Sequence, residues 1–106
     1  MIRNELEKIY FTSVNIDDDF WSPRLKNHQE TTIKACLEKC ETEERILNFE
    51  RTYNGNADEG FTGVAFNDSD VYKVIEGVGY SLQNNPNKEL EEYVDSIIDK
   101  IGMAQQ

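Results

Sequence analysis

The chain has 106 residues and a mass of 12.3 kDa, which limits it to one small domain. Hydrophobic residues make up 38% and charged residues 30%, a balance too mixed for a membrane span and too apolar for a wholly disordered chain. The net charge of −10 argues against nucleic acid and anionic membrane surfaces as partners, because both would repel the chain.

The amino-terminal residues predict a leader and a short strand. Residues 1–13 form a poorly defined leader, and residues 14–106 are expected to form the folded segment. Within residues 9–16 the apolar side chains follow a partly alternating pattern, which predicts a short strand across that boundary.

The next segment predicts the start of a helix. Ser22 is suited to cap the helix and Pro23 to occupy its first position, so the helix should begin near Pro23. The preceding run Asp17–Asp19 is interpreted as a solvated turn, because it lacks the alternating ligands and the glycine of a calcium-binding loop. Trp21 could stack on a sugar, but an aromatic residue beside Phe20 is more often part of a core.

Two segments follow, one regular and one irregular. Apolar residues recur at steps of three and four, which predicts a helix ending within residues 41–43. Residues 44–66 contain glycines and isolated aromatic residues, which indicate an irregular connection held by ring burial. The apolar residues of the predicted helix are Ile33, Cys36, Leu37 and Cys40.

A second helix is expected to open at Asp68 or Ser69 and to stop at residues 84–86. It contains Gly77 and Gly79, each costing about 1 kcal/mol relative to alanine, so a close neighbour is expected against it. Its apolar stripe consists of Val71, Val74, Ile75, Val78 and Leu82.

A third helix is expected to begin near Asn87, antiparallel to the second, with one apolar and one charged face. The residues of its apolar face are Leu90, Tyr93, Val94, Ile97, Ile98 and Ile101.

The two cysteines allow three interpretations. Cys36 and Cys40 lie four apart on one helix face, where a metal could bridge them together with His28, yet a full zinc shell would still lack a ligand. Buried free thiols are the preferred interpretation, and a disulfide is the remaining one. We therefore predict no metal site in this chain.

Three stretches, taken together, resemble the opening of the bacterial β-L-arabinofuranosidase type of glycoside hydrolase. These stretches are Phe20–Leu25, Phe66–Lys73 and the closing run from Ile97 to Gln106, and the second is the most specific. The resemblance implies a mainly α fold made of the first helical hairpins of an (α/α) toroid. It also implies that the family continues beyond the pattern at Gln106, so a truncated amino-terminal segment is expected.

The resemblance further implies a retaining mechanism with a zinc-held cysteine nucleophile, whose residues lie later in the family's sequence. We therefore expect no catalytic residue and no cofactor in this chain, and zinc only in the full-length enzyme. Asn67, Asp68 and Asp70 are the candidate substrate-binding residues, because the toroid's pocket opens where loops meet inner helices. For Asp68 and Asp70, helix capping and first-turn stabilisation remain the plainer interpretation.

The functional hypothesis is an amino-terminal segment of a glycosidase acting on arabinofuranosyl linkages of plant glycans and inactive by itself. The alternative is a small helical binding module without catalysis. Expected partners are the remainder of the parent chain, a carbohydrate substrate in the full-length enzyme, and a second copy of this chain through the partly uncovered apolar stripe of the second helix. The first residues lack the apolar run of a signal peptide, so a cytoplasmic location is expected.

Overall fold

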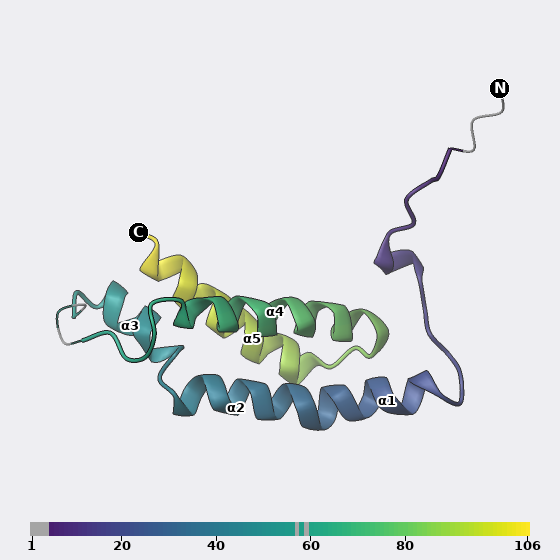
Figure 1. Cartoon of the computed structure of the whole chain (residues 1–106), viewed down its shortest axis with the longest axis horizontal. Helices are drawn as coiled ribbons and strands as arrows, with labels where there is room; N and C mark the ends of the chain where they lie inside the picture. The colour runs from purple at the N-terminus through teal and green to yellow at the C-terminus, as the bar shows by residue number, and fades with distance from the viewer. Residues whose placement is uncertain (1–4, 57, 59) are drawn as a thin grey trace.

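The computed structural model describes residues 5–56, 58 and 60–106. In Figure 1, α1, η2 and α2 run end to end as one rod, the α4–α5 pair lies beside it, and α3 lies towards the carboxyl end of α5. The predicted mainly α fold is confirmed. The elements are η1 (Phe11–Ser13), α1 (Trp21–Asn27), η2 (His28–Ile33), α2 (Lys34–Thr42), α3 (Leu47–Tyr53), α4 (Asn67–Asn84) and α5 (Lys88–Ala104).

The predicted strand at residues 9–16 is wrong. This segment contains the short 3-10 helix η1 and otherwise lies in an exposed arm that leaves the helical body in Figure 1. A strand needs a neighbour for its backbone hydrogen bonds, and the described part of the chain offers none. The arm instead touches α4, where the rings of Phe11 and Tyr80 meet edge to face at 4.9 Å and the Gln83 amide donates to the Thr12 carbonyl.

The first helix begins two residues earlier than predicted. Trp21 is its first residue, and the Asp18 carboxylate accepts the backbone N–H groups of Phe20, Trp21 and Ser22. The predicted cap at Ser22 is therefore wrong, because Asp18 satisfies the free amides from further upstream. The interpretation of Asp17–Asp19 as an exposed turn is confirmed.

Trp21 is not a core residue in this structure. Its exposed fraction is 55%, and its ring meets that of Phe20 edge to face at 5.0 Å. The interpretation as a core side chain is wrong because the start of the helix extends beyond the end of the α4–α5 pair in Figure 1, which leaves the Trp21 side chain exposed.

The first helix ends in a backbone geometry for which the sequence contains no local signal. The helix ends at Thr42, within the predicted range, and Glu44 adopts a left-handed φ of 58°. The Arg45 N–H donates to the Cys40 carbonyl and the Glu44 N–H donates to the Glu41 carbonyl, which together form a Schellman motif. A glycine usually holds this position, so a glutamate there gave no stop signal.

Residues 44–66 were predicted to be irregular, but they contain the short helix α3. This short helix packs against α5, and an ion pair between Lys100 and Glu50 of 2.5 Å joins the two elements. It ends at Tyr53, and Gly55 follows with a left-handed φ of 75°. Seven residues are too few for a clear helical period, so contacts with the rest of the fold stabilise this helix.

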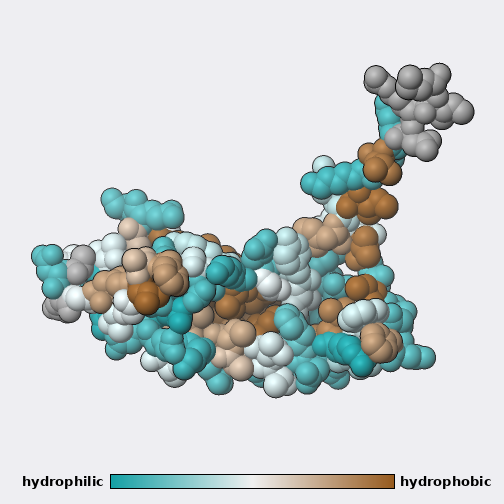
Figure 2. Space-filling view, viewed as in Figure 1, coloured by the Kyte–Doolittle hydropathy of each residue, from teal (hydrophilic) through white to brown (hydrophobic). Residues whose placement is uncertain are grey.

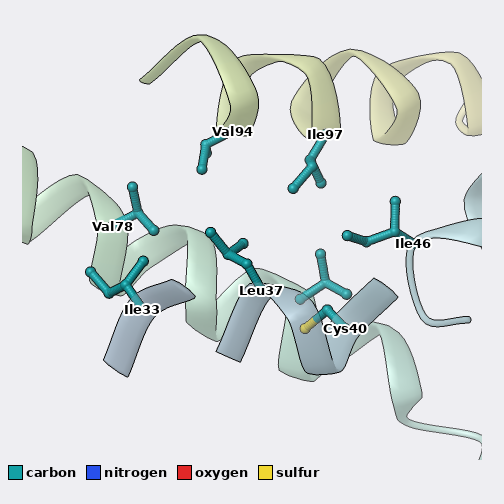
Figure 3. Close-up of a cluster of buried hydrophobic side chains, with 8 residues drawn as sticks. Ile33, Leu37, Cys40, Ile46, Val78, Val94 and Ile97 are labelled. Carbon is teal, nitrogen blue, oxygen red and sulfur yellow. The ribbon is translucent and has the colours of Figure 1, made fainter. Parts of the chain in front are cut away.

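The core lies between the rod and the two long helices. In Figure 3, the side chains of Val94 and Ile97 from α5 point towards Leu37 and Cys40 of α2, while Ile46 closes one end. The apolar stripes predicted for the three helices therefore meet in one cluster, except that Cys36, Tyr93 and Ile98 are exposed and lie outside it. Its buried members are Ile33, Leu37, Cys40, Ile46, Val71, Val78, Val94 and Ile97.

A buried glutamine ties the rod to the α4–α5 turn. The Gln29 amide nitrogen donates to the Asn85 carbonyl at 2.7 Å and to the Ser81 hydroxyl at 3.2 Å, and its oxygen accepts from Asn87 at 3.4 Å. Asn87 also caps α5 by accepting the Leu90 N–H, so the predicted start of that helix is confirmed. The predicted three-residue link makes α4 and α5 antiparallel neighbours, as expected.

The glycines of α4 do not face a close neighbour in this structure. A Cβ atom added at Gly77 or Gly79 would meet no atom within 4 Å. The predicted close contact is therefore absent within the described residues, because the elements that cover α4 lie on its Val71 and Val78 side.

The molecule exposes more surface than a compact domain of its size. Its accessible surface is 8206 Å² and its radius of gyration 17.8 Å, against roughly 6,100 Å² and roughly 13 Å for a compact domain of this mass and length. Figure 2 shows part of the reason, a projecting arm with many hydrophobic residues, and also apolar surface across the middle of the helical body.

Candidate functional site

The three predicted substrate-binding residues lie together at the start of α4. Asn67 is 3% exposed, and its amide nitrogen donates to the Thr62 carbonyl at 3.0 Å. Its backbone N–H donates to the Val64 carbonyl at 3.0 Å. Asn67 therefore holds the preceding loop against the helix, and its predicted sugar contact stays a prediction.

Asp70 is part of an ion network rather than a free carboxylate. It pairs with Arg45 and, at 3.5 Å, with Lys73, while the second terminal nitrogen of Arg45 lies 2.7 Å from Glu43. The Arg45 side chain is only 18% exposed, so this network joins the end of α2 to the first turn of α4. The hydrogen bond to Glu43 raises the pKa of Arg45, and burial opposes that rise.

Asp68 faces a small surface cavity between α3 and α4. The cavity has a volume of about 170 Å³, and Phe49 and Phe61 line it together with Arg45 and Asn48. Asp68 or Ser69 was expected to cap α4, but α4 begins at Asn67 and no side chain caps it. The carboxylate instead lies near Tyr72, whose pKa is raised first by burial and then by Asp68.

A second network fixes the loop that forms the cavity wall. The Glu44 carboxylate accepts from the Thr62 hydroxyl at 2.8 Å and pairs with Arg51 at 3.0 Å. The Asn48 amide donates to the Thr62 carbonyl at 2.9 Å and its oxygen accepts the Thr62 N–H at 3.2 Å. Asp68 is the one carboxylate among the described residues that line the cavity, and its oxygens offer acceptor capacity for a ligand.

Arg45 and Thr62 are the organising residues that the sequence analysis missed. Both lie in the stretch interpreted as irregular, and neither belongs to a recognisable motif. The available signal was charge alone, since Arg45 is a basic residue that follows a run of glutamates at the end of a predicted helix. Such a pattern is common on solvated helix ends, so it did not single out Arg45.

The cysteines do not form a metal centre within the described residues. Both thiols are free, Cys40 is buried and Cys36 is exposed. The interpretation as buried thiols is thus correct for Cys40 and wrong for Cys36, which lies on the flank of α2 beside the core-facing stripe. Burial raises the pKa of the Cys40 thiol, so the group is a poor nucleophile. No cluster of three or more histidine, cysteine or acidic residues suited to a metal occurs in the described ranges.

A larger depression lies between α2 and the first turns of α5. Its volume is about 320 Å³. Tyr93 spans it, donating its hydroxyl to Glu41 at 2.6 Å. Burial, followed by this bond, raises the pKa of Tyr93. None of the predicted site residues lines this depression.

This chain is similar in sequence and in structure to β-arabinofuranosidases. Residues 13–106 match the family described as "Beta-L-arabinofuranosidase, GH127 catalytic domain". A "Non-reducing end beta-L-arabinofuranosidase" of Bifidobacterium longum subsp. longum is 44% identical over 52 residues, which cover 49% of this chain. A solved GH127 β-arabinofuranosidase is 42% identical, with a TM-score of 0.78 over 91% of this chain.

The matched regions are short relative to those proteins. The match covers 8% of the Bifidobacterium protein and 15% of the solved chain. The helices described above therefore correspond to a small part of a much larger molecule. Among the described residues, no helix has the length and apolar character needed to cross a membrane.

Proposed function

The chain belongs to the family of β-L-arabinofuranosidase GH127 catalytic domains, and from that premise we propose that it supplies the first helices of a glycosidase toroid. The proposed enzyme cleaves arabinofuranosyl linkages of plant glycans. The observation that carries this proposal is the agreement over 91% of the chain with a solved β-arabinofuranosidase. A self-sufficient binding module is less favoured, because the exposed surface greatly exceeds that of a compact domain.

Catalysis is assigned to the part of the enzyme outside this chain. The chemistry implied by the family needs a zinc-held thiolate, and the residues present do not fit that group. Cys40 is buried in the core, Cys36 faces solvent, and the described residues hold no cluster suited to a metal. We therefore assign neither the nucleophile nor a zinc ligand to this chain.

The contribution of this chain to the substrate site is a rim contact at the start of α4. Asp68 supports this proposal because it faces a cavity with acceptor capacity available for sugar hydroxyls. Asp70 contributes through its position beside Asp68, with its charge balanced by Arg45 and Lys73. Asn67 contributes by fixing the loop.

A reducing, cytoplasmic location is part of the proposal. The support is the state of the two cysteines, of which one is a free thiol exposed at the surface. Exposed free thiols are uncommon in proteins that fold in oxidising compartments.

A chimera tests the proposed function. The corresponding segment of the solved GH127 relative is replaced by this chain, and cleavage of an aryl β-L-arabinofuranoside is measured. The expected result is a chimera with kcat/KM within about tenfold of the parent, while the isolated chain shows no turnover. A chimera that folds by circular dichroism and gel filtration but is inactive would overturn the proposal, as would turnover by the isolated chain.

The rim contact is tested in the same chimera. Asp68→Asn is expected to raise KM about tenfold with a smaller change in kcat, because a ground-state hydrogen bond is lost. Asp99→Asn on the exposed face of α5 is the matched control and should leave KM unchanged. Equal KM values for both variants would exclude Asp68 from the rim.

A further inference from the structure

The depression between α2 and α5 has the features of a docking groove. It is about 320 Å³ in volume and lies between the second half of the rod and the first turns of α5. Its apolar lining comes from Leu37, Leu90 and the ring of Tyr93, of which Leu37 is buried, Leu90 is partly buried and Tyr93 is exposed. An unfilled apolar groove directly above the core is a site where further burial is favourable.

The edge of this groove is acidic. Glu38 and Glu41 lie on the α2 side and Glu89 on the α5 side, with Lys34 as the one basic residue in the lining. Glu41 is engaged by the Tyr93 hydroxyl. Within the described part of the chain, neither Glu38 nor Glu89 takes part in a salt bridge. Two carboxylates on opposite sides of an apolar groove are thus available to cationic groups of a partner.

We propose that this groove receives an amphipathic helix of the remaining catalytic domain, with an apolar side chain in the groove and lysine or arginine residues beside Glu38 and Glu89. This rests on the proposed function, since the chain matches only 15% of a solved family member and shows a large excess of exposed surface. The groove and its charges select a basic helix over an acidic one, because the chain already carries a net charge of −10.

The first test uses this chain alone and a 14-residue amphipathic peptide made only of leucine and lysine. Binding is followed by fluorescence anisotropy, with the equivalent leucine–glutamate peptide as a comparison. Glu89→Lys and Glu38→Lys are each expected to weaken the leucine–lysine peptide about tenfold, because each places like charge against it.

Glu91→Lys is the matched control. Glu91 lies in the same first turn of α5 and undergoes the same charge change, but it does not line the groove. It should change the affinity less than about threefold, which accounts for the general loss of negative charge. Equal weakening by Glu89→Lys and Glu91→Lys would overturn the proposal, and so would preferential binding of the leucine–glutamate peptide.

The second test uses the chimera with the solved relative. Glu89→Lys should lower the thermal midpoint of the chimera more than Glu91→Lys, and more than it does in the isolated chain. An active chimera in which both variants unfold alike would overturn the groove proposal and leave the proposed function standing. An inactive chimera accompanied by groove-specific peptide binding would overturn the proposed function and leave the groove as a binding site for a basic helix. Self-association of this chain that Glu89→Lys abolishes and Glu91→Lys preserves would assign the groove to a second copy and overturn the proposal.

Discussion

At the residue scale, the start of α4 combines one structural side chain with two surface carboxylates. Asn67 is buried and bonded to the Thr62 carbonyl, whereas Asp68 and Asp70 are only partly buried. Neighbouring positions in one motif therefore have different roles. Measurements of stability can separate the structural role of Asn67 from any effect of Asp68 and Asp70 on substrate binding.

Asn67→Ala is expected to lower the free energy of unfolding of the chain by about 1–2 kcal/mol, because it removes a buried hydrogen bond and leaves a gap beside the loop. Asp68→Ala, the matched control, should change stability by less than about 0.5 kcal/mol. Urea denaturation monitored by circular dichroism measures both. Similar losses for the two variants would contradict the structural role given to Asn67.

The loop network predicts a dependence of stability on pH. Hydrogen bonds from Thr62 and then Arg51 lower the pKa of Glu44 below its ordinary value of 4.5, and bonds from Lys39 and then Arg45 do the same for Glu43. A carboxylate with a lowered folded-state pKa stabilises the fold fully above its unfolded pKa, and that contribution is lost as the pH falls through the folded value. The contribution should therefore be complete at neutral pH, begin to fall near the unfolded pKa of about 4.5 and disappear only below the lower folded-state pKa values.

Glu44→Gln should consequently lower the urea midpoint at neutral pH and have less effect in acid, below the lowered pKa of Glu44, where the native carboxylate is protonated. Glu38→Gln replaces an exposed glutamate outside both networks and controls for net charge. An equal loss for Glu44→Gln at both pH values would show that the ionised form of Glu44 contributes nothing.

At the element scale, helix boundaries depend on which groups satisfy the free backbone N–H and C=O groups. Asn87 was predicted to start α5 and does so with a side-chain cap. Asp18 and Glu44 set the boundaries of the first helix, although the sequence favoured Ser22 and offered no glycine at the stop. Several nearby side chains can satisfy the free backbone groups at a helix end. The sequence therefore predicts the helix boundary to within a few residues but does not identify the capping residue.

The glycines of α4 give a prediction for the helix itself. Gly77→Ala and Gly79→Ala should each stabilise the isolated chain by about 0.5–1 kcal/mol, because the new methyl group meets no neighbour and the unfolded chain loses freedom. Gly63→Ala should destabilise by about 1 kcal/mol or more, since that residue has a left-handed φ. Its added Cβ would lie 2.5 Å from the Asn67 amide. Thermal unfolding measures all three.

The same substitutions test whether another part of the catalytic domain packs closely on α4 at Gly77 and Gly79. If the rest of the catalytic domain packs closely on α4, Gly77→Ala or Gly79→Ala should destabilise the chimera while stabilising the isolated chain. Stabilisation in both would mean that these glycines serve no packing role in the assembled domain.

At the scale of the whole molecule, the excess of exposed surface sets the behaviour of the isolated chain. Several large hydrophobic side chains remain exposed, among them Phe66 at 67% and Tyr80 at 49% on or beside α4. The buried part of the predicted apolar stripe, which includes Val71 and Val78, is covered by the chain itself. The surface open to a second copy is therefore the aromatic side of α4 rather than that stripe.

We expect this chain to associate with itself as its concentration rises, because exposed apolar patches favour contact with one another. Light scattering coupled to gel filtration should show an average mass above 12.3 kDa that increases with concentration. Replacing Tyr80 with serine should reduce the association, and Tyr53→Ser on α3 is a control on another face. A strictly monomeric chain at high concentration would contradict this expectation.

The sequence by itself determined the three long helices, the faces they bury and the antiparallel link between α4 and α5, because helical periodicity and strong breakers act over a few residues. The sequence also indicated the family, because the run from Phe66 to Lys73 resembles it most specifically. Only the tertiary structure decided that residues 9–16 form no strand, that α3 exists, and that Arg45 and Thr62 organise the start of α4. Each of these depends on partners distant in the chain, and no local pattern encodes which distant group will satisfy a backbone, a ring or a charge.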